Sequence, residues 1–247
     1  MSSVAVEVVV ANLNGGATGR ESAGIVNALL ELIDPDQSTI VLLQEVVDSA
    51  AEEVRRRLPD WHSASRMLSP TATDPAATMG LATVSTCSVS SRRFFSFPNP
   101  QLRATQPDGQ RWSSHEKGAL LTTHPIGHGA SITALNLHAL PFHRFGVEDR
   151  SEVVHRTWHT FLTSVETEVG DDRYLIMAGD FNLEDRSALD HFVTGHRLRS
   201  QFEGAPTRPS GGTSDELYLG EALTSIATET VDIGSDHFAL VCRLGLT

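Results

Sequence analysis

The chain has 247 residues, of which 40% are hydrophobic and 20% are charged, and its formal net charge is −12. This composition is ordinary for a soluble globular protein with a substantial core. The acidic balance disfavours a protein that coats nucleic acid by bulk electrostatics, because that mode needs cations to replace phosphate counterions. A local basic groove is still compatible with it.

The basic and sulfur-containing residues bear on three kinds of site: phosphate-binding sites, disulfides and zinc sites. Arginine accounts for 18 of the 19 basic residues, and Lys117 is the one lysine. Arginine suits bidentate phosphate recognition, although a biased genome composition explains the excess equally well. Cys87 and Cys242 lie in apolar stretches, so two buried free thiols are expected rather than a disulfide or a zinc site. The first residues lack a charged leader pattern and no apolar run could cross a bilayer, so a cytoplasmic protein is expected.

Strands and helices alternate along the first half of the chain. The predicted strands are 4–13, 38–46, 80–89, 117–124 and 130–138. The hydrophobic spacing predicts helices at 20–34 and 49–58. Segment 98–116 is rich in proline, glycine and polar residues and is predicted to be a loop. FFSF at 94–97 indicates either an exposed apolar patch or, as we favour, an ordinary strand.

The second half continues the alternation. The pattern predicts a long helix at 146–169, a strand within YLIMAGDFN (174–182) and a short helix near 186–193. A Gly-, Pro- and Ser-rich loop at 204–214 precedes two closing strands, near 223–231 and 238–244. No repeat and no polar linker separates these elements, so we expect one α/β domain over residues 1–247.

Polar side chains stand at the ends of the apolar runs in six places. They are Asn12, Glu45, Asn136 with His138, Asp180 with Asn182, Asp215, and Asp236 with His237. Taken alone, each is more simply explained as a cap, a turn or a hydrogen-bonded structural residue. Taken together they favour a site, because ligands of α/β sheets gather at the carboxyl ends of strands. Asp215 is the exception, since it starts its run.

At two of these six places, backbone geometry decides whether both side chains can face one site. Residues two apart in an extended chain point to the same side, so Asp180 and Asn182 would face one place. Adjacent residues point to opposite sides, so Asp236 and His237 can share a site only if Gly234 and Ser235 form a bend.

Several converging carboxylates would repel one another and raise each other's pKa unless a cation lies among them. The candidate ligands are oxygen donors, with no cysteine nearby. Oxygen ligands suit a hard cation, and the sequence therefore predicts a Mg²⁺ or Mn²⁺ site.

In the order of these motifs the sequence resembles the endonuclease/exonuclease/phosphatase superfamily, the deoxyribonuclease-I-like metal-dependent phosphohydrolases. The resemblance runs from residue 6 to residue 244. Its motifs are an early Asn12, QE at 44–45, GLA at 80–82, NLH at 136–138, GDFN at 179–182, Asp215 beside DEL, and SDH at 235–237. GDFN and SDH are the most specific. The resemblance implies a four-layer α/β sandwich, with two packed mixed β-sheets flanked by helices.

The resemblance also implies a role for each residue. Glu45 is the expected principal metal ligand, assisted by Asn12 and Asp236. Asp180 is expected to orient or deprotonate the attacking water, and Asn182 to donate a hydrogen bond to the phosphate. The further catalytic residues are His237, which contacts the phosphate or transfers a proton, Asp215, which fixes its tautomer, and His138, the second histidine of many members. Whether Asp180 or His237 is the general base is left open.

The sequence departs from the family pattern in places. Asn14 stands where many members have an acid, and tyrosine is scarce, so no tyrosine matches the phosphate contact of the abasic-site enzymes. His143 and Arg144 follow the NLH motif and are either substrate contacts or part of a solvated loop.

The expected function is hydrolysis of a phosphoester, most simply by a phosphodiesterase acting on nucleic acid. The alternative is a phosphatase or phospholipase-type hydrolase of small phosphorylated or lipid substrates, and a non-enzymatic module is disfavoured because each catalytic position is filled. Acidity mildly favours a small substrate. Five arginines would favour a polyanion if they formed one patch: Arg92, Arg93, Arg103, Arg111 and Arg144.

Overall fold

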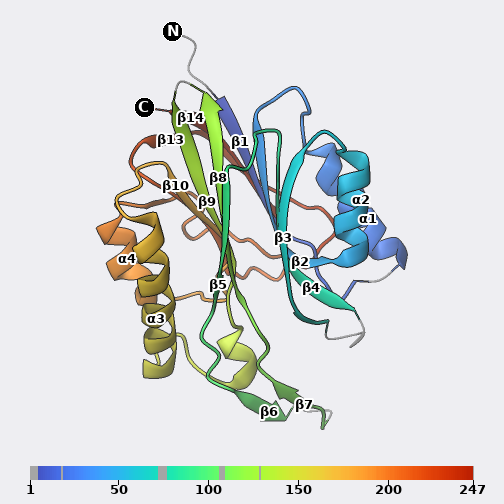
Figure 1. The fold of residues 1–247 in the computed structure, drawn as a ribbon. Helices are drawn as coiled ribbons and strands as arrows, with labels where there is room; N and C mark the ends of the chain where they lie inside the picture. The colour runs from blue at the N-terminus through green and yellow to red at the C-terminus, as the bar shows by residue number, and fades with distance from the viewer. Residues whose placement is uncertain (1–4, 18, 72–76, 106–108, 128, 247) are drawn as a thin grey trace.

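The computed structural model describes residues 5–17, 19–71, 77–105, 109–127 and 129–246, which form two six-stranded sheets packed face to face (Figure 1). In spatial order, sheet A contains β13 (Leu223–Val231), β14 (Ala239–Leu246), β1 (Ala5–Asn12), β2 (Thr39–Val47), β4 (Thr78–Ser85) and β3 (His62–Pro70). Sheet B contains β11 (Arg199–Ser200), β12 (Asp215–Leu219), β10 (Leu175–Asp180), β9 (Ala130–His138), β8 (Gly118–Gly127) and β5 (Ser91–Ser96). Val4, which the sequence placed in the first strand, and residues 106–108 of the expected loop lie outside the described residues.

Each sheet combines one parallel pair of strands with antiparallel neighbours. In sheet A, β1 and β2 are parallel, and in sheet B, β9 and β10 are parallel. The remaining described pairs within the two sheets are antiparallel. Both sheets are therefore mixed, as the resemblance implied.

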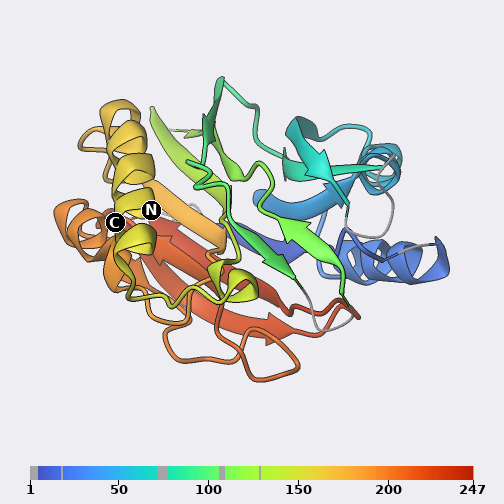
Figure 2. The same ribbon diagram turned by 90° about the horizontal axis from the view of Figure 1, so that it is seen from below.

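Helices cover the outer face of each sheet, so the molecule has four layers (Figures 1 and 2). Helices α1 (Gly19–Glu31) and α2 (Asp48–Arg57) pack on sheet A. Helix α3 (Glu152–Val169) packs on sheet B through Trp158 and Phe161, with α4 (Asp190–Gly195) beside it. Two short 3₁₀ helices, η1 (Phe142–Phe145) and η2 (Ser187–Leu189), complete these elements. The predicted four-layer α/β sandwich is confirmed.

Strand alternation produces three large apolar cores among the described residues, and a small fourth cluster contains Ala64, Leu81 and Leu120. The even-numbered residues of β1, from Val6 to Val10, face sheet B, while Val9 and Ala11 face the helices. On β10, Ile176 and Ala178 face sheet A, while Met177 faces α3. These central strands are buried on both faces, which explains why they are nearly continuous runs of apolar residues.

Several local predictions were wrong in detail. Strand β3 was not predicted, because HSASRMLSP lacks a regular apolar alternation and the strand forms by pairing along β4. The segment predicted as a loop contains a ribbon of β6 (Arg103–Thr105) and β7 (Arg111–Ser113). The favoured prediction for FFSF is confirmed: Phe94, Phe95 and Ser96 lie in β5, and Phe95 and Phe97 are buried.

The two cysteines differ in burial. Both are free; Cys242 is buried, but Cys87 is only half-buried. Strand β4 ends at Ser85 instead of residue 89, so Cys87 lies in the bend beyond the sheet. Within the described part of the chain, no helix combines the length and apolar character that crossing a bilayer requires.

His124 on β8 makes stability depend on pH. Its side chain is fully buried, and burial lowers its pKa to about 4 from an ordinary value of 6.5. Because the unfolded chain binds the proton more tightly, stability should be full above pH 6.5 and fall as the pH drops toward 4. The expected loss is roughly 3 kcal/mol.

Urea unfolding at several pH values measures this loss. His124→Gln should remove most of this part of the acid slope, while His159→Gln on the exposed side of α3 serves as the control. An unchanged slope in His124→Gln would contradict the assignment.

Candidate active site

The polar residues of five central strands lie where the core between the sheets ends. On each strand, the residues facing the opposite sheet are apolar until the last one or two positions. The polar residues at those positions are Asn12, Gln44, Asn136, His138, Asp180 and Asp215. The carboxyl ends of β1, β2, β9 and β10 lie at this edge, which Figure 2 views end-on. Asp215 starts its strand because β12 runs antiparallel to β10.

Strand register places His138, Asp180 and Asp215 side by side on sheet B. Asp180 is paired with His138 of β9 on one side and with Asp215 of β12 on the other. The distance from His138 Nε2 to Asp180 Oδ2 is 3.8 Å. Because register is a property of the whole sheet, the apolar runs of three strands determine these neighbours.

Gly179 allows the strands to approach at this point. It has a φ of +137°, and a Cβ atom built on it would lie 2.0 Å from the carbonyl oxygen of Leu137. Any side chain would therefore push β10 away from β9. Close backbone approach is why glycine precedes the acid of GDFN.

The strand ends at Asp180, so the extended geometry expected for Asn182 does not hold. Asn182 has a φ of +51°, and its backbone N–H donates to Asp180 Oδ1 at 2.9 Å. Its side-chain amide donates to the carbonyl oxygen of Ala139 at 3.1 Å. Asn182 is thus beside the acid through a turn and not through strand alternation.

Glu45 reaches the same place through an irregularity in β2. The pairing of β2 with β4 shifts between Leu43 and Val46, and Glu45 has a φ of +52°. Such a bulge redirects a side chain that would otherwise follow the strand alternation. Oε2 of Glu45 accepts the Gly15 N–H at 2.9 Å, and Oε1 lies 3.6 Å from His138 Nε2.

Asn12 connects sheet A to the acid of sheet B. Its amide Nδ2 donates to Asp180 Oδ2 at 3.3 Å, and its Oδ1 accepts the backbone N–H of Asn14 at 3.0 Å. Asn12, Glu45 and Asp180 therefore bring polar side-chain atoms from three strands to one region, with the amide nitrogen of Asn12 toward Asp180.

His237 closes the site from the segment before β14. Gly234 has a φ of +78°, and residues 234–237 form a bend in which the Ser235 hydroxyl donates to the carbonyl oxygen of Asn12 at 2.8 Å. This is the bend that the sequence required for Asp236 and His237 to lie together. His237 Nε2 is 3.8 Å from Asp180 Oδ2 and 3.9 Å from Asp236 Oδ2.

Asp215 controls the charge and orientation of His237. The distance from His237 Nδ1 to Asp215 Oδ2 is 2.8 Å, and Thr207 Oγ1 donates to the same carboxylate at 2.8 Å. Burial alone would lower the pKa of His237. The hydrogen bond to Asp215 and the negative charges of Asp180 and Asp215 outweigh burial and raise this pKa to about 9.

The buried carboxylates of Asp180 and Asp215 carry negative charge that the neighbouring His237 only partly compensates. Burial raises the pKa of the Asp180 carboxyl, and the nearby charge of Asp215 raises it further. One ligand atom each from Asp180, Asp215 and His237 lies within 4.8 Å of the others. Buried carboxylates of this kind fit a hard divalent cation. Of the two acids, Asp215 already accepts hydrogen bonds from neighbouring side chains.

Comparison with known proteins decides the family. A sequence profile of the Endonuclease/Exonuclease/phosphatase family matches residues 9–237. The chain belongs to this family. Its members are phosphoester hydrolases. No curated protein matches the chain.

Solved structures of the family share the fold at low identity. A family protein from Bacteroides vulgatus has a TM-score of 0.71 at 18% identity, over 98% of this chain and 99% of its own. TDP2 from D. rerio in complex with a single strand DNA product has a TM-score of 0.61 at 14% identity, covering 98% and 99%. A mannosyl-6-phosphatase from Bacteroides thetaiotaomicron has a TM-score of 0.63 at 15% identity, covering 97% and 99%.

Asn136, the first residue of the family's NLH motif, lies behind the acids and joins the two sheets. Its Nδ2 donates to the carbonyl oxygens of Leu43 and Ala82 of sheet A, each at 3.0 Å. Its Oδ1 accepts from Gln44 Nε2 at 2.7 Å. Asn136 and Gln44 are fully buried, so these hydrogen bonds form where water cannot replace them.

A buried ion pair between Arg186 and Glu216 stabilises the backbone at Asp215. Arg186 pairs with Glu216 at 3.1 Å and also donates to the carbonyl oxygen of Asp215 at 2.9 Å. Glu216 is fully buried and accepts the Phe202 N–H at 2.9 Å. These contacts hold the first residues of β12, which carries the partner of His237.

Lys117 is a site residue that the motif analysis missed. Its ammonium nitrogen lies 3.0 Å from Nε2 and 3.2 Å from Nδ1 of His138. Only 7% of the residue is exposed. Its one signal in the sequence was that it is the only lysine, at the start of a predicted strand.

The remaining candidates lie at the rim. The Asp236 side chain is 49% exposed and accepts a hydrogen bond from Arg208 at 3.2 Å. His143 and Arg144 are exposed in η1, and the Arg144 guanidinium carbon lies 5.6 Å from the Trp112 ring centre.

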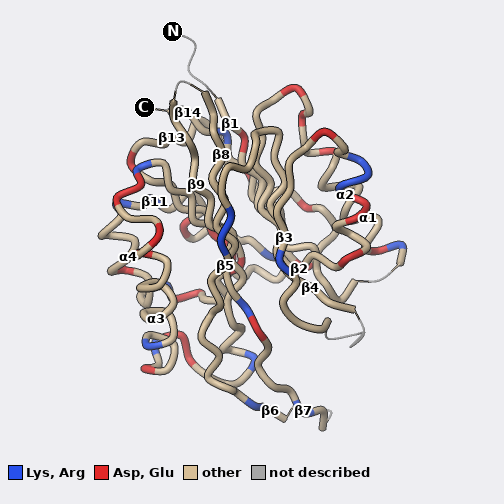
Figure 3. The backbone as a smooth tube through the Cα atoms, in the orientation of Figure 1, with Lys and Arg blue, Asp and Glu red and all other residues tan. Residues whose placement is uncertain are grey.

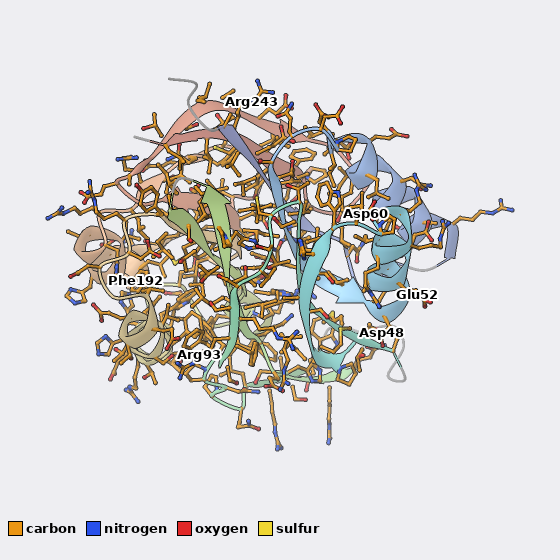
Figure 4. All side chains as sticks on the ribbon, turned by 45° about the horizontal axis from the view of Figure 1, so that its top comes forward. Asp48, Glu52, Asp60, Arg93, Phe192 and Arg243 are labelled. Atoms are coloured by element: carbon orange, nitrogen blue, oxygen red, sulfur yellow. The ribbon has the colours of Figure 1, made fainter. Side chains whose placement is uncertain are left out.

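The five arginines expected at the rim do not form one patch. Arg92 and Arg93 lie on β5, and Figure 4 labels Arg93. Arg93 pairs with Glu168 of α3. Arg103 and Arg111 lie on the β6–β7 ribbon, and Figure 3 shows the basic segments of β5 and of the ribbon well apart. Only the ribbon group lies near Arg144, since Arg144 contacts Trp112 of β7.

Asn136→Ala should destabilise the fold, because it removes one hydrogen-bond partner from buried polar atoms of Gln44, Leu43 and Ala82. The expected loss in urea unfolding is roughly 2–4 kcal/mol. Asn27→Ala on the exposed side of α1 is the matched control. A loss for Asn136→Ala no larger than that of the control would show that the hydrogen bonds between the sheets contribute little.

Proposed function

We propose that this family member is a divalent-metal-dependent phosphodiesterase that cleaves nucleic acid by attack of water. The observation that supports it is the meeting of Glu45, Asp180 and the His237–Asp215 pair at one edge of two sheets. A carboxylate-lined region facing a carboxylate–histidine pair suits hydrolysis of a phosphoester.

Glu45, Asn12 and Asp236 are the proposed metal ligands, and Mg²⁺ or Mn²⁺ is the proposed ion. Two observations support a cation between the sheets. The Oε1 atom of Glu45 faces His138 of the opposite sheet, and the pKa of the nearby Asp180 carboxyl is raised. A bound divalent ion would neutralise charge that develops on the phosphate oxygens. Asp236 Oδ2 lies 3.9 Å from His237 Nε2 and accepts a hydrogen bond from Arg208, so the arginine would compete with a metal ion for this carboxylate.

The chain's own residues handle the proton. Asp180, with a raised pKa and a buried carboxylate, is the proposed acceptor that orients and deprotonates the attacking water. His237 keeps Nε2 free because Nδ1 binds Asp215, and its raised pKa favours the charged imidazolium that faces the phosphate. Asn182 retains one amide hydrogen for the phosphate. Burial lowers the pKa of His138 well below its usual range, which keeps that ring neutral.

Cations and an aromatic ring at the rim support nucleic acid as the substrate. Burial lowers the pKa of His143, and the charges of Arg144 and Arg208 lower it further, so both arginines lie close to it. Arg144 lies over Trp112, and a basic residue beside an aromatic face suits the backbone and bases of a single strand. The neighbouring TDP2 structure contains a single strand DNA product. His143 and Arg144 are the proposed substrate contacts.

A small phosphorylated molecule is the second candidate. The net charge of −12 opposes wide contact with a polyanion. A mannosyl-6-phosphatase shares the fold. The described basic side chains outside the rim are largely paired with acids, as Arg93, Arg150 and Arg197 are.

A substrate panel separates the candidates. Plasmid DNA, structured RNA, an inositol phosphate and sphingomyelin should each be tested with Mg²⁺, with Mn²⁺ and with a chelator. We expect metal-dependent cleavage of a nucleic acid. Hydrolysis confined to the small substrate or the lipid would favour the second candidate, and no hydrolysis at all would refute the proposed function.

Glu45→Gln should abolish hydrolysis of a generic phosphodiester, because the amide removes the negative charge proposed to hold the ion. The fold should survive, since the amide oxygen of the new side chain can still accept the Gly15 N–H. Glu52→Gln on the outer side of α2 (Figure 4) is the matched control and should stay active. Full activity of Glu45→Gln, measured at saturating metal, would contradict the assignment.

His237→Ala tests whether His237 transfers a proton or contacts the phosphate, and hydrolysis by this variant should be strongly reduced. Loss of a general acid–base group typically costs on the order of 10²–10⁴ in rate. His155→Ala on α3 is the comparison variant. A reduction of less than about tenfold would remove His237 from the proposed catalytic set.

A further inference from the structure

We propose that Lys117 is a catalytic residue whose ammonium group binds a non-bridging oxygen of the substrate phosphate. This inference rests on the proposed function, because it assigns a contact within the same site. Three observations carry it: where the backbone places the side chain, how many of its donors are used, and why the position holds lysine.

The backbone aims Lys117 at the site. Its neighbour Gly118 is paired with His138 at the carboxyl end of β9. The carbonyl oxygen of Lys117 accepts the Phe97 N–H at 2.8 Å, which anchors the chain just before β8. The side chain therefore enters at the level of His138 and Asp180, from the strand on the far side of His138.

The ammonium group has donors to spare. A lysine ammonium carries three N–H donors. Within the described part of the chain, His138 is its one hydrogen-bond partner, and the nearly equal distances of 3.0 and 3.2 Å bring the ammonium against one edge or face of a single ring. At most one ring nitrogen can accept in good geometry, so at least two donors remain for an anionic oxygen in a region closed to bulk water.

The negative charges of Glu45 and Asp180 act on the Lys117 ammonium group. Burial lowers the pKa of Lys117, and the charges of Glu45 and Asp180 oppose that effect. Lys117 is thus close enough to the proposed metal ligand and to the proposed water-activating acid for their charges to act on it, and its measured contact is with His138, which lies 3.6 Å from Glu45 and 3.8 Å from Asp180. A phosphate between these groups would lie within reach of the ammonium.

Amino-acid usage adds an independent argument. The chain uses arginine at 18 of its 19 basic positions, and the single lysine is the basic residue that contacts His138. A guanidinium is a wide planar fork, whereas an ammonium is a compact point charge with three rotatable donors. Beside the buried His138 ring the compact ammonium needs less room than a guanidinium would, which suits a lysine in a chain otherwise built with arginine.

The single lysine makes the contact directly measurable. Protein labelled with ¹⁵N at lysine Nζ gives one side-chain resonance, from Lys117 alone. We expect inorganic phosphate to shift this resonance saturably, with the same dissociation constant as its inhibition of hydrolysis. Lack of a shift at phosphate concentrations that inhibit hydrolysis would overturn the inference.

Variants test the same contact by kinetics. Lys117→Met should lower kcat by roughly 10²–10³, as removal of a preorganised donor to a developing oxyanion does. Lys117→Ala should regain activity with added methylammonium, and the exposed Arg55→Ala of α2 should not respond to it. A kcat for Lys117→Met within about threefold of the parent would also overturn the inference.

The two proposals fail in different ways. A protein that hydrolyses phosphodiesters but shows no phosphate-dependent shift retains the proposed function and loses the Lys117 contact. A protein that hydrolyses no substrate of the panel, yet shows the shift, retains the phosphate contact and loses the proposed function.

Discussion

The buried amide pair of Gln44 and Asn136 fixes how the two sheets sit on each other. Apolar packing between sheets is non-directional, so it alone would tolerate small sliding movements. The hydrogen bonds from Asn136 to Leu43, Ala82 and Gln44 have preferred directions and cross the interface one position behind the acids. The distance between the residues of sheet A and those of sheet B at the active site depends on this clamp.

The site is the place where the core between the sheets stops being apolar. Burial that stabilises the valines and leucines of the central strands becomes costly at the last inward position, where carboxylates replace them. Asp180 shows that cost in its raised pKa, and His237 and Lys117 supply part of the opposing charge. The same burial that makes these charges costly strengthens the electrostatic interactions among them, which is what the proposed chemistry requires.

Much of this arrangement could be predicted from the sequence. Continuous apolar runs located β1, β2, β9 and β10, although the short strand β12 was not predicted, and a polar residue at the end of these runs located the edge of the sheets. The GDFN and SDH motifs identified the family, which implied the four layers. These signals are local or lie within one element, so a single sequence contains them.

Other features depend on contacts between distant elements. Glu45 needs a bulge to leave the strand alternation, and Asn182 needs a left-handed turn. Asn136 looked like a site residue because its partners, the carbonyl oxygens of another sheet, leave no trace in the side-chain pattern. Strand β3 and the β6–β7 ribbon follow their pairing partners more than their own composition.

The bend that carries Ser235 and His237 also makes the candidate site depend on a strand that comes late in the sequence. Ser235 donates to Asn12 across 223 residues, and β14, which follows the bend, lies between β13 and β1 inside sheet A. Residues 239–246 must therefore be synthesised before that strand can insert and hold the histidine in place. A chain that lacks them would lose the support of the bend, and with it the geometry on which the proposed function depends.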